Sequence, residues 1–200
     1  MMDLTEASLV KLAQHFYPTG YPVTADEYDS EGLLQCQRTP EYARWLEAWD
    51  KAMAWPEWQT LRQEVRSVFP RCGDCTQPRC SACRRCCVYN STPLPNGARQ
   101  LTIVAAAASV LAPLYVVYCT TEVVVDKHSE RRPSLFLEVP EEVKPQAAAL
   151  SGLVERVLGY QAFPLQFAQV HVPGIRVGNN DGTGATLLEA LFDDRLESLF

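Results

Sequence analysis

Apolar side chains recur at helical spacing through the first third of the chain, which predicts amphipathic helices there. The first stripe consists of Leu4, Leu9, Val10, Leu12, Ala13 and Phe16. A second helix is predicted to begin with Thr39 as its N-cap and Pro40 at its first position, and a third begins at Pro56. All four tryptophans, Trp45, Trp49, Trp55 and Trp58, fall within fourteen residues at helical spacing. We therefore expect the tryptophans to pack in a core rather than to stack on a ligand.

The apolar pattern changes between Leu101 and Thr121, a stretch without charged residues that is long enough to span a bilayer. Four consecutive alanines, a central Pro113 and a run of β-branched and aromatic residues instead favour two buried strands, 100–109 and 114–125, joined by a turn. A third strand is predicted over Ser134–Val139. We therefore expect a buried sheet here and no membrane partner.

The last third of the chain alternates between helical and strand patterns. The sequence predicts a helix from Pro140 to Gly159, a strand over Gln166–Val172, a loop over Gly178–Gly184 and a closing helical segment over Ala185–Phe200. Helices followed by strands and then by mixed elements are typical of an α+β fold with a mostly antiparallel sheet. We expect one domain over residues 1–200, with a helical part (1–70), a cysteine-rich loop (71–87) and a part with the sheet and the C-terminal helices (88–200).

Charge is unevenly distributed along the chain. The net charge is −6, of which residues 1–70 contribute −5, residues 71–100 contribute +4 and residues 101–200 contribute −5. A net negative charge argues against a protein that binds nucleic acids in general. The basic island holds Arg71, Arg79, Arg84 and Arg85, which would either contact phosphates of single-stranded RNA or keep an exposed loop solvated.

Six of the eight cysteines fall within residues 72–87, in the spacing C-x2-C-x4-C-x2-C-x2-C-C. Pairs of thiolates two residues apart suit tetrahedral zinc, so the sequence predicts a structural zinc site formed from Cys72, Cys75, Cys80, Cys83 and Cys86. The spacing of the last three of these residues also fits an iron–sulfur cluster, although the usual closing Cys-Pro is missing. Free thiols in an ordinary strand and loop are the third alternative. The N-terminus lacks the pattern of a secretory signal, so we expect a cytoplasmic protein with reduced cysteines.

No arrangement of residues typical of catalysis is found in the sequence. The histidines, His15, His128 and His171, are not spaced as a metal pair, and neither G-x-S-x-G nor HExxH occurs. The glycine-rich stretch Gly178–Gly184 is not followed by the Lys-Ser or Lys-Thr of a phosphate loop. We therefore expect that the protein is not an enzyme.

Five short segments follow one another in the second half of the chain: Leu114–Tyr118, Leu135–Glu142, Val154–Tyr160, Val172–Ile175 and Gly184–Asp194. They are preceded by the helix Trp58–Phe69 and by a strand that contains an aspartate and cysteines. Over about residues 40–200 this order resembles a group of bacterial immunity proteins, which neutralise secreted polymorphic toxins and are abundant in myxobacteria. The resemblance implies an inhibitory protein that has a protein toxin as its partner and no catalytic residues. The family pattern has at most one or two cysteines where this chain has six, so a metal site would be particular to this chain.

An acidic inhibitor would attract a basic, nuclease-like toxin, because opposite charges speed association. The sequence places four carboxylates around one tyrosine in a predicted loop, and we expect this loop to bind the toxin: Asp26, Glu27, Tyr28, Asp29 and Glu31. A second acidic segment holds Asp193, Asp194 and Glu197. The alternative interpretation of both segments is exposed surface that keeps the protein soluble and binds no partner. The alternative function is that of a zinc-containing nucleic-acid-binding or regulatory adaptor protein.

Overall fold

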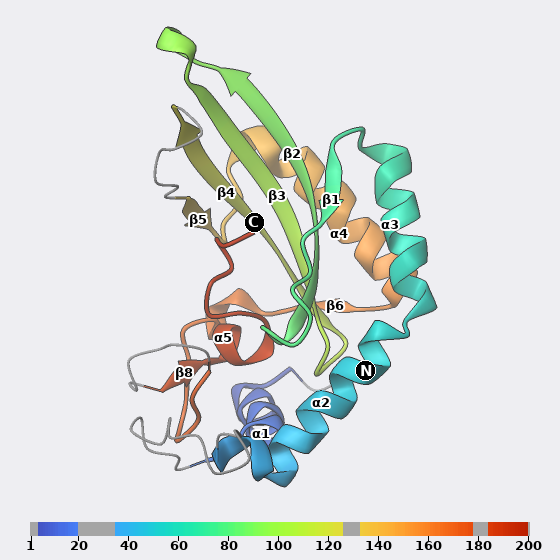
Figure 1. Ribbon diagram of the computed structural model, residues 1–200, viewed down its shortest axis with the longest axis vertical. Coiled ribbons are helices and arrows are strands. Elements are labelled where there is room, and N and C mark those ends of the chain that lie inside the picture. Colours follow the sequence, from blue (N-terminus) through green and yellow to red (C-terminus); the bar gives the residue numbers. More distant parts are fainter. Residues whose placement is uncertain (1–3, 20–34, 126–132, 178–183, 200) are drawn as a thin grey trace.

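The protein has an α+β fold built on one long antiparallel sheet, as the sequence predicts. The computed structural model describes residues 4–19, 35–125, 133–177 and 184–199. The main path of the sheet has the order β1-β2-β3-β4-β5 with antiparallel neighbours, and a short sixth strand, β6 (Gln161–Ala162), pairs in parallel with β4. These strands are β1 (Cys72–Asp74), β2 (Cys83–Pro93), β3 (Arg99–Ser109), β4 (Leu114–Val124) and β5 (Ser134–Phe136). The end of the β2–β3 hairpin extends beyond the helices (Figure 1).

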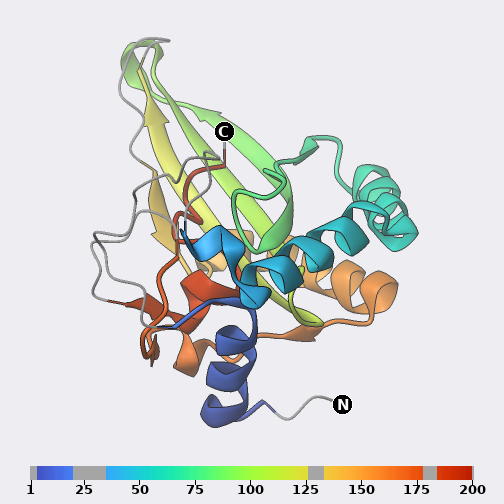
Figure 2. The same cartoon turned by 60° about the horizontal axis from the view of Figure 1, so that its bottom comes forward.

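Helices cover the two faces of the sheet unequally. Helices α3 (Pro56–Val68) and α4 (Lys144–Leu158) pack on one face, where Trp58, Leu61 and Leu150 are fully buried. The other face meets α5 (Leu187–Leu191) and the C-terminal segment, and α1 (Glu6–Phe16) packs on α5 in turn (Figure 2). Helix α2 (Pro40–Met53) forms a third cluster at the end of the sheet near the β3–β4 turn. The helical cover therefore lies over one end of the second face.

Capping residues set the ends of these helices. Thr5 and Ser8 form a capping box at the start of α1, and the Thr39 side chain accepts a hydrogen bond from the Tyr42 amide at the start of α2. Gly159, in the left-handed conformation, ends α4. The predicted helices of the first third and the helix before Gly159 are thus confirmed, and Trp45, Trp49 and Trp58 are buried as expected.

The uncharged stretch Leu101–Thr121 forms parts of β3 and β4 with a tight turn between them, as predicted. Residues Ala105–Ala108 alternate between the two faces, and their small side chains leave room for the elements that pack above and below the sheet. Within the described part of the chain, no helix is long and apolar enough to cross a membrane.

The expected cysteine-rich loop is wrong for much of its length. Cys72–Asp74 form β1, and Cys83–Pro93 form β2, whose first six residues are all buried. The two arginines in this stretch, Arg84 and Arg85, hide the apolar character of β2 in the sequence. Both side chains contact partners from distant parts of the chain inside the protein, as described below.

Two elements of the last third also differ from the prediction. The expected strand over Gln166–Val172 is a short 3-10 helix, η4 (Leu165–Phe167), followed by a strand of two residues, β7 (His171–Val172), which pairs with β8 (Ala185–Thr186). The expected closing helix is limited to α5, because the backbone of Phe192 leaves the helical conformation. The remaining elements are β6 (Gln161–Ala162), parallel to β4, and η1 (Gln35–Arg38), η2 (Pro95–Gly97) and η3 (Glu141–Val143).

Candidate binding groove on the open face of the sheet

The register of the strands places rows of side chains across the face that carries α5. One row holds Gly73, Cys87, Ala105 and Tyr118, and the next holds Tyr89, Ile103 and Thr120. Further toward the hairpin end follow a row with Ser91, Leu101 and Glu122 and a row with Pro93, Arg99 and Val124. Side chains directly opposite each other in antiparallel strands share a face. The face therefore offers a regular array on β2, β3 and β4.

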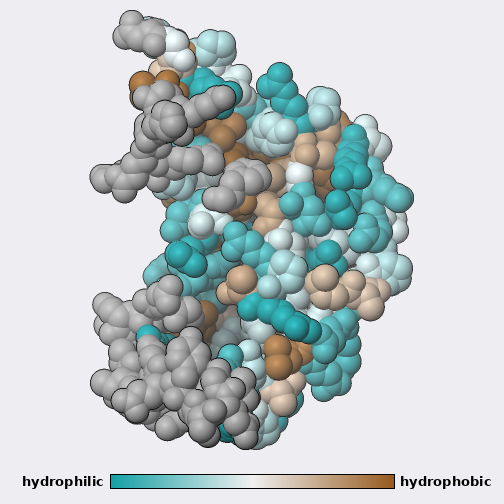
Figure 3. Space-filling model, in the orientation of Figure 1, coloured by the Kyte–Doolittle hydropathy of each residue, from teal (hydrophilic) through white to brown (hydrophobic). Residues whose placement is uncertain are grey.

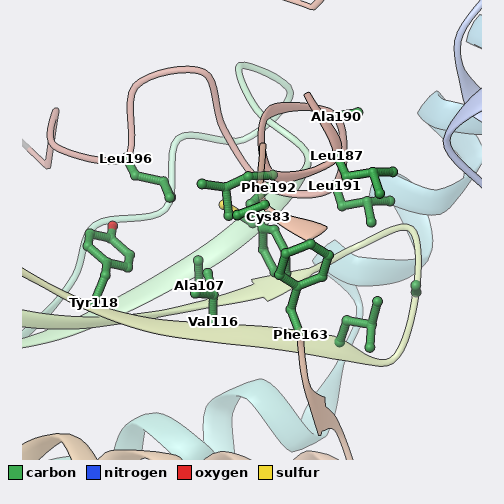
Figure 4. Packing of buried hydrophobic residues seen from close by; sticks show 14 of the residues in the cluster. Cys83, Ala107, Val116, Tyr118, Phe163, Leu187, Ala190, Leu191, Phe192 and Leu196 are labelled. Carbon is green, nitrogen blue, oxygen red and sulfur yellow. The ribbon is translucent and has the colours of Figure 1, made fainter. Parts of the chain in front are cut away.

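The C-terminal segment covers the first of these rows and the rows before it. Figure 4 shows Phe192 and Leu196 over Cys83, Ala107, Val116 and Tyr118. The Phe192 ring meets the Phe163 ring edge to face, with the ring centroids 5.5 Å apart. This packing continues to the buried Leu199 and covers Ile103 and Thr120 of the next row, whereas Tyr89 in the same row is 36% exposed.

A groove of about 660 Å³ lies where this cover ends. We call it the sheet groove and define it by Arg71, Tyr89, Ser91, Arg99, Leu101 and Ile103. A second hollow of about 280 Å³, lined by Glu122, Arg195 and Leu199 among others, shares Ile103 with it. In Figure 3, apolar patches are visible between hydrophilic side chains in the upper half of the molecule, where the outer parts of the strands lie. The groove thus has an apolar floor and a polar rim.

The rim of the sheet groove carries two arginines that lack an ion-pair partner among the described residues. Both Arg71 and Arg99 are exposed, and Tyr89 beside them is 36% exposed. Seven other arginines each lie within 4.0 Å of a carboxylate oxygen: Arg44, Arg62, Arg79, Arg84, Arg85, Arg156 and Arg195. Guanidinium groups without a carboxylate are available to bind an anion. The groove is therefore a site with local positive charge on an acidic protein.

Arg85 anchors the C-terminal segment next to the groove. Its side chain is 1% exposed, and its Nη1 lies 3.3 Å from Oδ2 of Asp193 and donates to the Ser198 carbonyl at 3.2 Å. Burial raises the pKa of the Asp193 carboxyl above its usual value, against the opposing effects of the Arg195 amide and of Arg85. Asp193 is buried, so the second acidic segment does not present this carboxylate to a partner, contrary to expectation.

Arg84 belongs to a second buried network, on the opposite face. Its guanidinium lies 4.7 Å from the centroid of the Trp58 ring and donates to the Ala52 carbonyl at 2.8 Å. Asp74 accepts hydrogen bonds from Trp58 Nε1 at 3.1 Å and from the Thr76 amide at 3.0 Å, and Arg62 Nε lies 3.2 Å from it. Burial opposes ionisation of Asp74, but the hydrogen bonds from Thr76 and Trp58 and the charge of Arg62 together lower its pKa. Of the basic island, Arg84 and Arg85 are therefore structural, and Arg79 pairs with Asp50.

The predicted metal ligands lie apart from one another. Cys75 and Cys83 belong to the cluster on the groove face, Cys86 and Cys72 belong to the cluster under α3 and α4, and Cys80 is exposed. Residues three apart on a strand point to opposite faces, which separates Cys83 from Cys86. In the described ranges, no group of three or more His, Cys, Asp or Glu side chains is placed to hold a metal ion. The predicted ligands Cys83 and Cys86 are thus on opposite faces of β2, and the zinc site stays a prediction.

Cys87 is not among the predicted metal ligands. Its thiol differs from the other buried cysteines because its pKa is lowered. The neighbouring Cys75 and the backbone of Gly73 lower the pKa of the Cys87 thiol, although burial opposes the shift. Burial raises the pKa of Cys83 to about 12 and also raises that of Cys86. Cys87 and burial raise the pKa of Cys75, whose thiol donates a hydrogen bond to the Arg85 carbonyl at 3.7 Å. The sequence signal for this pair is weak, because it depends on the register of β1 against β2.

The predicted toxin-binding residues Asp26, Glu27, Tyr28, Asp29 and Glu31 lie outside the described residues, and their role stays a prediction. The same is true of His128. His15 and His171 are exposed and lie on α1 and β7.

No family model, no curated protein and no solved structure matched the chain when it was compared with them. The sheet groove and its two unpaired arginines are therefore the observations that bear most directly on function.

Proposed function

We propose that the protein is an immunity protein that binds and neutralises a cognate bacterial toxin in the cytoplasm, and that the toxin docks in the sheet groove. The supporting observation is the combination of the exposed side chains of Arg71, Arg99 and Tyr89 with a floor of Leu101 and Ile103. Arginine and tyrosine are enriched among the residues that contribute most of the binding free energy at protein interfaces. The resemblance of five segments to immunity proteins supports the same function.

The occupant that fits the groove is a loop or strand of the toxin that carries a carboxylate next to an apolar side chain. An unpaired guanidinium binds a carboxylate through two parallel hydrogen bonds, and the floor accepts an apolar side chain. Tyr89 and Ser91 on β2 and Arg99, Leu101 and Ile103 on β3 belong to two strands paired along their whole length, so the backbone of the groove is fixed before the partner arrives. Pro93 lacks an amide hydrogen and limits pairing at the free edge of β2, which favours docking on the face over addition of a strand.

The net negative charge of the whole chain acts at longer range than the local positive charge of Arg71 and Arg99 in the groove. A net charge of −6 attracts a basic toxin and speeds its encounter with the inhibitor. Once the two proteins touch, the local charge at Arg71 and Arg99 decides which segment of the toxin enters the groove. Steering and anchoring thus use charges of opposite sign on the same molecule.

The test is the affinity of the chain for the toxin encoded by the neighbouring gene, measured by titration calorimetry. A hydrogen bond to a charged group contributes about 1.5–3 kcal/mol, so the double variant Arg71→Glu/Arg99→Glu is expected to bind roughly 100-fold more weakly or worse. The matched control is Arg66→Glu, which reverses an exposed arginine on α3, outside the groove, and is expected to bind like the wild type. In cells that express the toxin, only the double variant should fail to protect. Equal affinity of all three proteins would remove the groove from the interface, and no binding by the wild type would contradict the function itself.

The alternative function, nucleic-acid binding, is favoured by one observation. A tyrosine and two arginines on the open face of an antiparallel sheet are also the side chains that stack on and neutralise single-stranded RNA. Fluorescence polarisation with a uridine-rich oligonucleotide distinguishes the two functions. Micromolar, salt-dependent binding that is lost in Arg71→Glu/Arg99→Glu, together with no binding of the toxin, would support the alternative and contradict our proposal.

A further inference from the structure

The outer edge of β4, on the side away from β3, is paired by two short strands that leave a gap between them. β5 pairs with β4 over Cys119–Thr121, and β6 pairs with it at Leu114 and Tyr115. Val117 lies midway between these two pairings. Tyr115 and Cys119 are separated by about 13 Å of strand, so the gap is too short for a further strand of ordinary length.

The backbone N–H and C=O of Val117 point away from β3, into this gap. Successive residues of an antiparallel strand direct their N–H and C=O alternately to one neighbouring strand and to the other. The Tyr115 carbonyl accepts a hydrogen bond from the Phe163 amide at 2.8 Å on the outer side, so Val117, two residues further on, also directs its groups outward. Within the described part of the chain, neither group of Val117 has a hydrogen-bond partner. One donor and one acceptor are thus open in the middle of an otherwise paired edge.

A pocket of about 240 Å³ lies at the gap. We call it the edge pocket and define it by Tyr115, Val117, Ala147, Ala148, Ser151 and Phe163. α4 lines it from one face of the sheet with small side chains, which leave the space open, and Phe163 belongs to the cluster on the other face. None of the described residues that line it carries a charge. The edge pocket therefore has apolar walls around the two open backbone groups.

These features select a small, neutral and planar ligand. A molecule that bonds to both groups of Val117 has to lie beside β4 in the plane of the sheet, and its two faces then meet the residues on either side of that plane. A flat ring satisfies this geometry. An added peptide strand does not, because β5 and β6 occupy the edge at both ends of the gap. Walls without charged side chains favour an uncharged molecule, since a buried charge without a partner is costly.

We propose that the edge pocket binds a neutral nitrogen heterocycle that carries an acceptor and a donor on adjacent atoms, as adenine does. The ring nitrogen next to the amino group accepts a hydrogen bond from the Val117 amide, and the amino group donates to the Val117 carbonyl. The faces of the ring contact Ala147 on one side and Phe163 on the other. Pairing of both backbone groups gives the ligand its orientation, and the apolar walls supply the burial.

The edge pocket is separate from the sheet groove. The groove is lined from β2, β3 and the start of β1, whereas the edge pocket lies on the far side of β4, and the two share no lining residue. The inference therefore does not depend on the proposed function, and its test needs no toxin.

The first test is a titration of the isotope-labelled full chain with adenine, followed by the backbone amide signals in NMR spectra. We expect saturable binding with a Kd of about 1 mM or lower, and the Val117 amide proton should move downfield as it becomes hydrogen-bonded. The dimethylamino analogue of adenine keeps the ring acceptor and lacks the donor, so it should bind several-fold more weakly. Absence of a saturable shift at Val117, or equal affinity for the two compounds, would overturn the proposal.

The location is tested with Ala148→Leu. Ala148 is exposed on α4 and lines the edge pocket, so the larger side chain should fill the pocket with little effect on the melting temperature, because leucine is also a good helix former. Binding of adenine should be at least roughly tenfold weaker. The matched control is Ala149→Leu, at the next exposed position of the same helix, which does not line the pocket and should bind like the wild type. Wild-type affinity in Ala148→Leu, or equal losses in both variants, would place the binding site elsewhere and overturn the proposal.

Discussion

At the scale of single residues, the buried ion pair of Arg85 and Asp193 connects the middle of β2 to the C-terminal segment. Neither residue is recognisable as buried from its neighbours in the sequence, since both stand among other charged residues. The pairing depends on a contact between parts of the chain more than 100 residues apart, as the bond from Arg85 to Ser198 also shows. A sequence pattern cannot indicate such a contact, which explains why the basic island was expected to be exposed.

Removal of one partner of this pair should destabilise the protein strongly. Arg85→Met leaves the Asp193 carboxylate buried without its cation, and loss of one partner of a buried pair costs about 3–5 kcal/mol. The free energy of unfolding in urea measures the loss. Arg79→Met is the matched control, because Arg79 pairs with Asp50 at the surface, where such pairs contribute about 0–1 kcal/mol. Similar losses in the two variants would show that the Arg85 pair is not buried in solution.

At the scale of elements, hydrophobic periodicity predicted the helices and the two central strands, and capping residues predicted where α2 begins. β2 was missed because its buried stretch includes two charged residues, whose partners lie on β1, on α3, just after α5 and in the backbone of α2. The candidate groove was also out of reach of sequence analysis. Its side chains come from three strands, and only the register of those strands brings them into one array. The local sequence signal for the groove is that every second residue of β3, namely Arg99, Leu101 and Ile103, lies on the same face.

Asp74 ties β1 to α3, and this contact should weaken in acid. Because its pKa is lowered on folding, Asp74 contributes stability that is complete above the pKa of an unfolded aspartate, about 3.9, and is lost as the pH falls through the folded value. Asp74→Asn should lower stability by about 2 kcal/mol at pH 7 and flatten the dependence of stability on pH below about 4. Urea unfolding at a series of pH values measures both effects. Asp50→Asn, at the surface, should change neither, and an unchanged pH profile of Asp74→Asn would contradict the assigned contacts.

At the scale of the whole molecule, the two faces of the sheet have different roles. One face is covered by α3 and α4 and holds Trp58 in a buried network, whereas the outer part of the other face carries the sheet groove. The acidic charge of the chain is spread over both ends of the sequence, and the local positive charge remains where Arg71 and Arg99 lack carboxylate partners among the described residues. A protein partner with a basic surface and one acidic, apolar segment satisfies both features. We therefore expect the partner to contact the sheet groove and not the face covered by α3 and α4.

Site-specific photo-crosslinking tests that location most directly. A benzoylphenylalanine introduced in place of Tyr89 lies on the rim of the sheet groove, and the same group in place of Met53, which is 51% exposed at the end of α2, lies toward the opposite end of the sheet. After irradiation of each protein with the cognate toxin, we expect a crosslinked complex from position 89 and none from position 53. A crosslink from position 53 and none from position 89 would contradict docking in the groove.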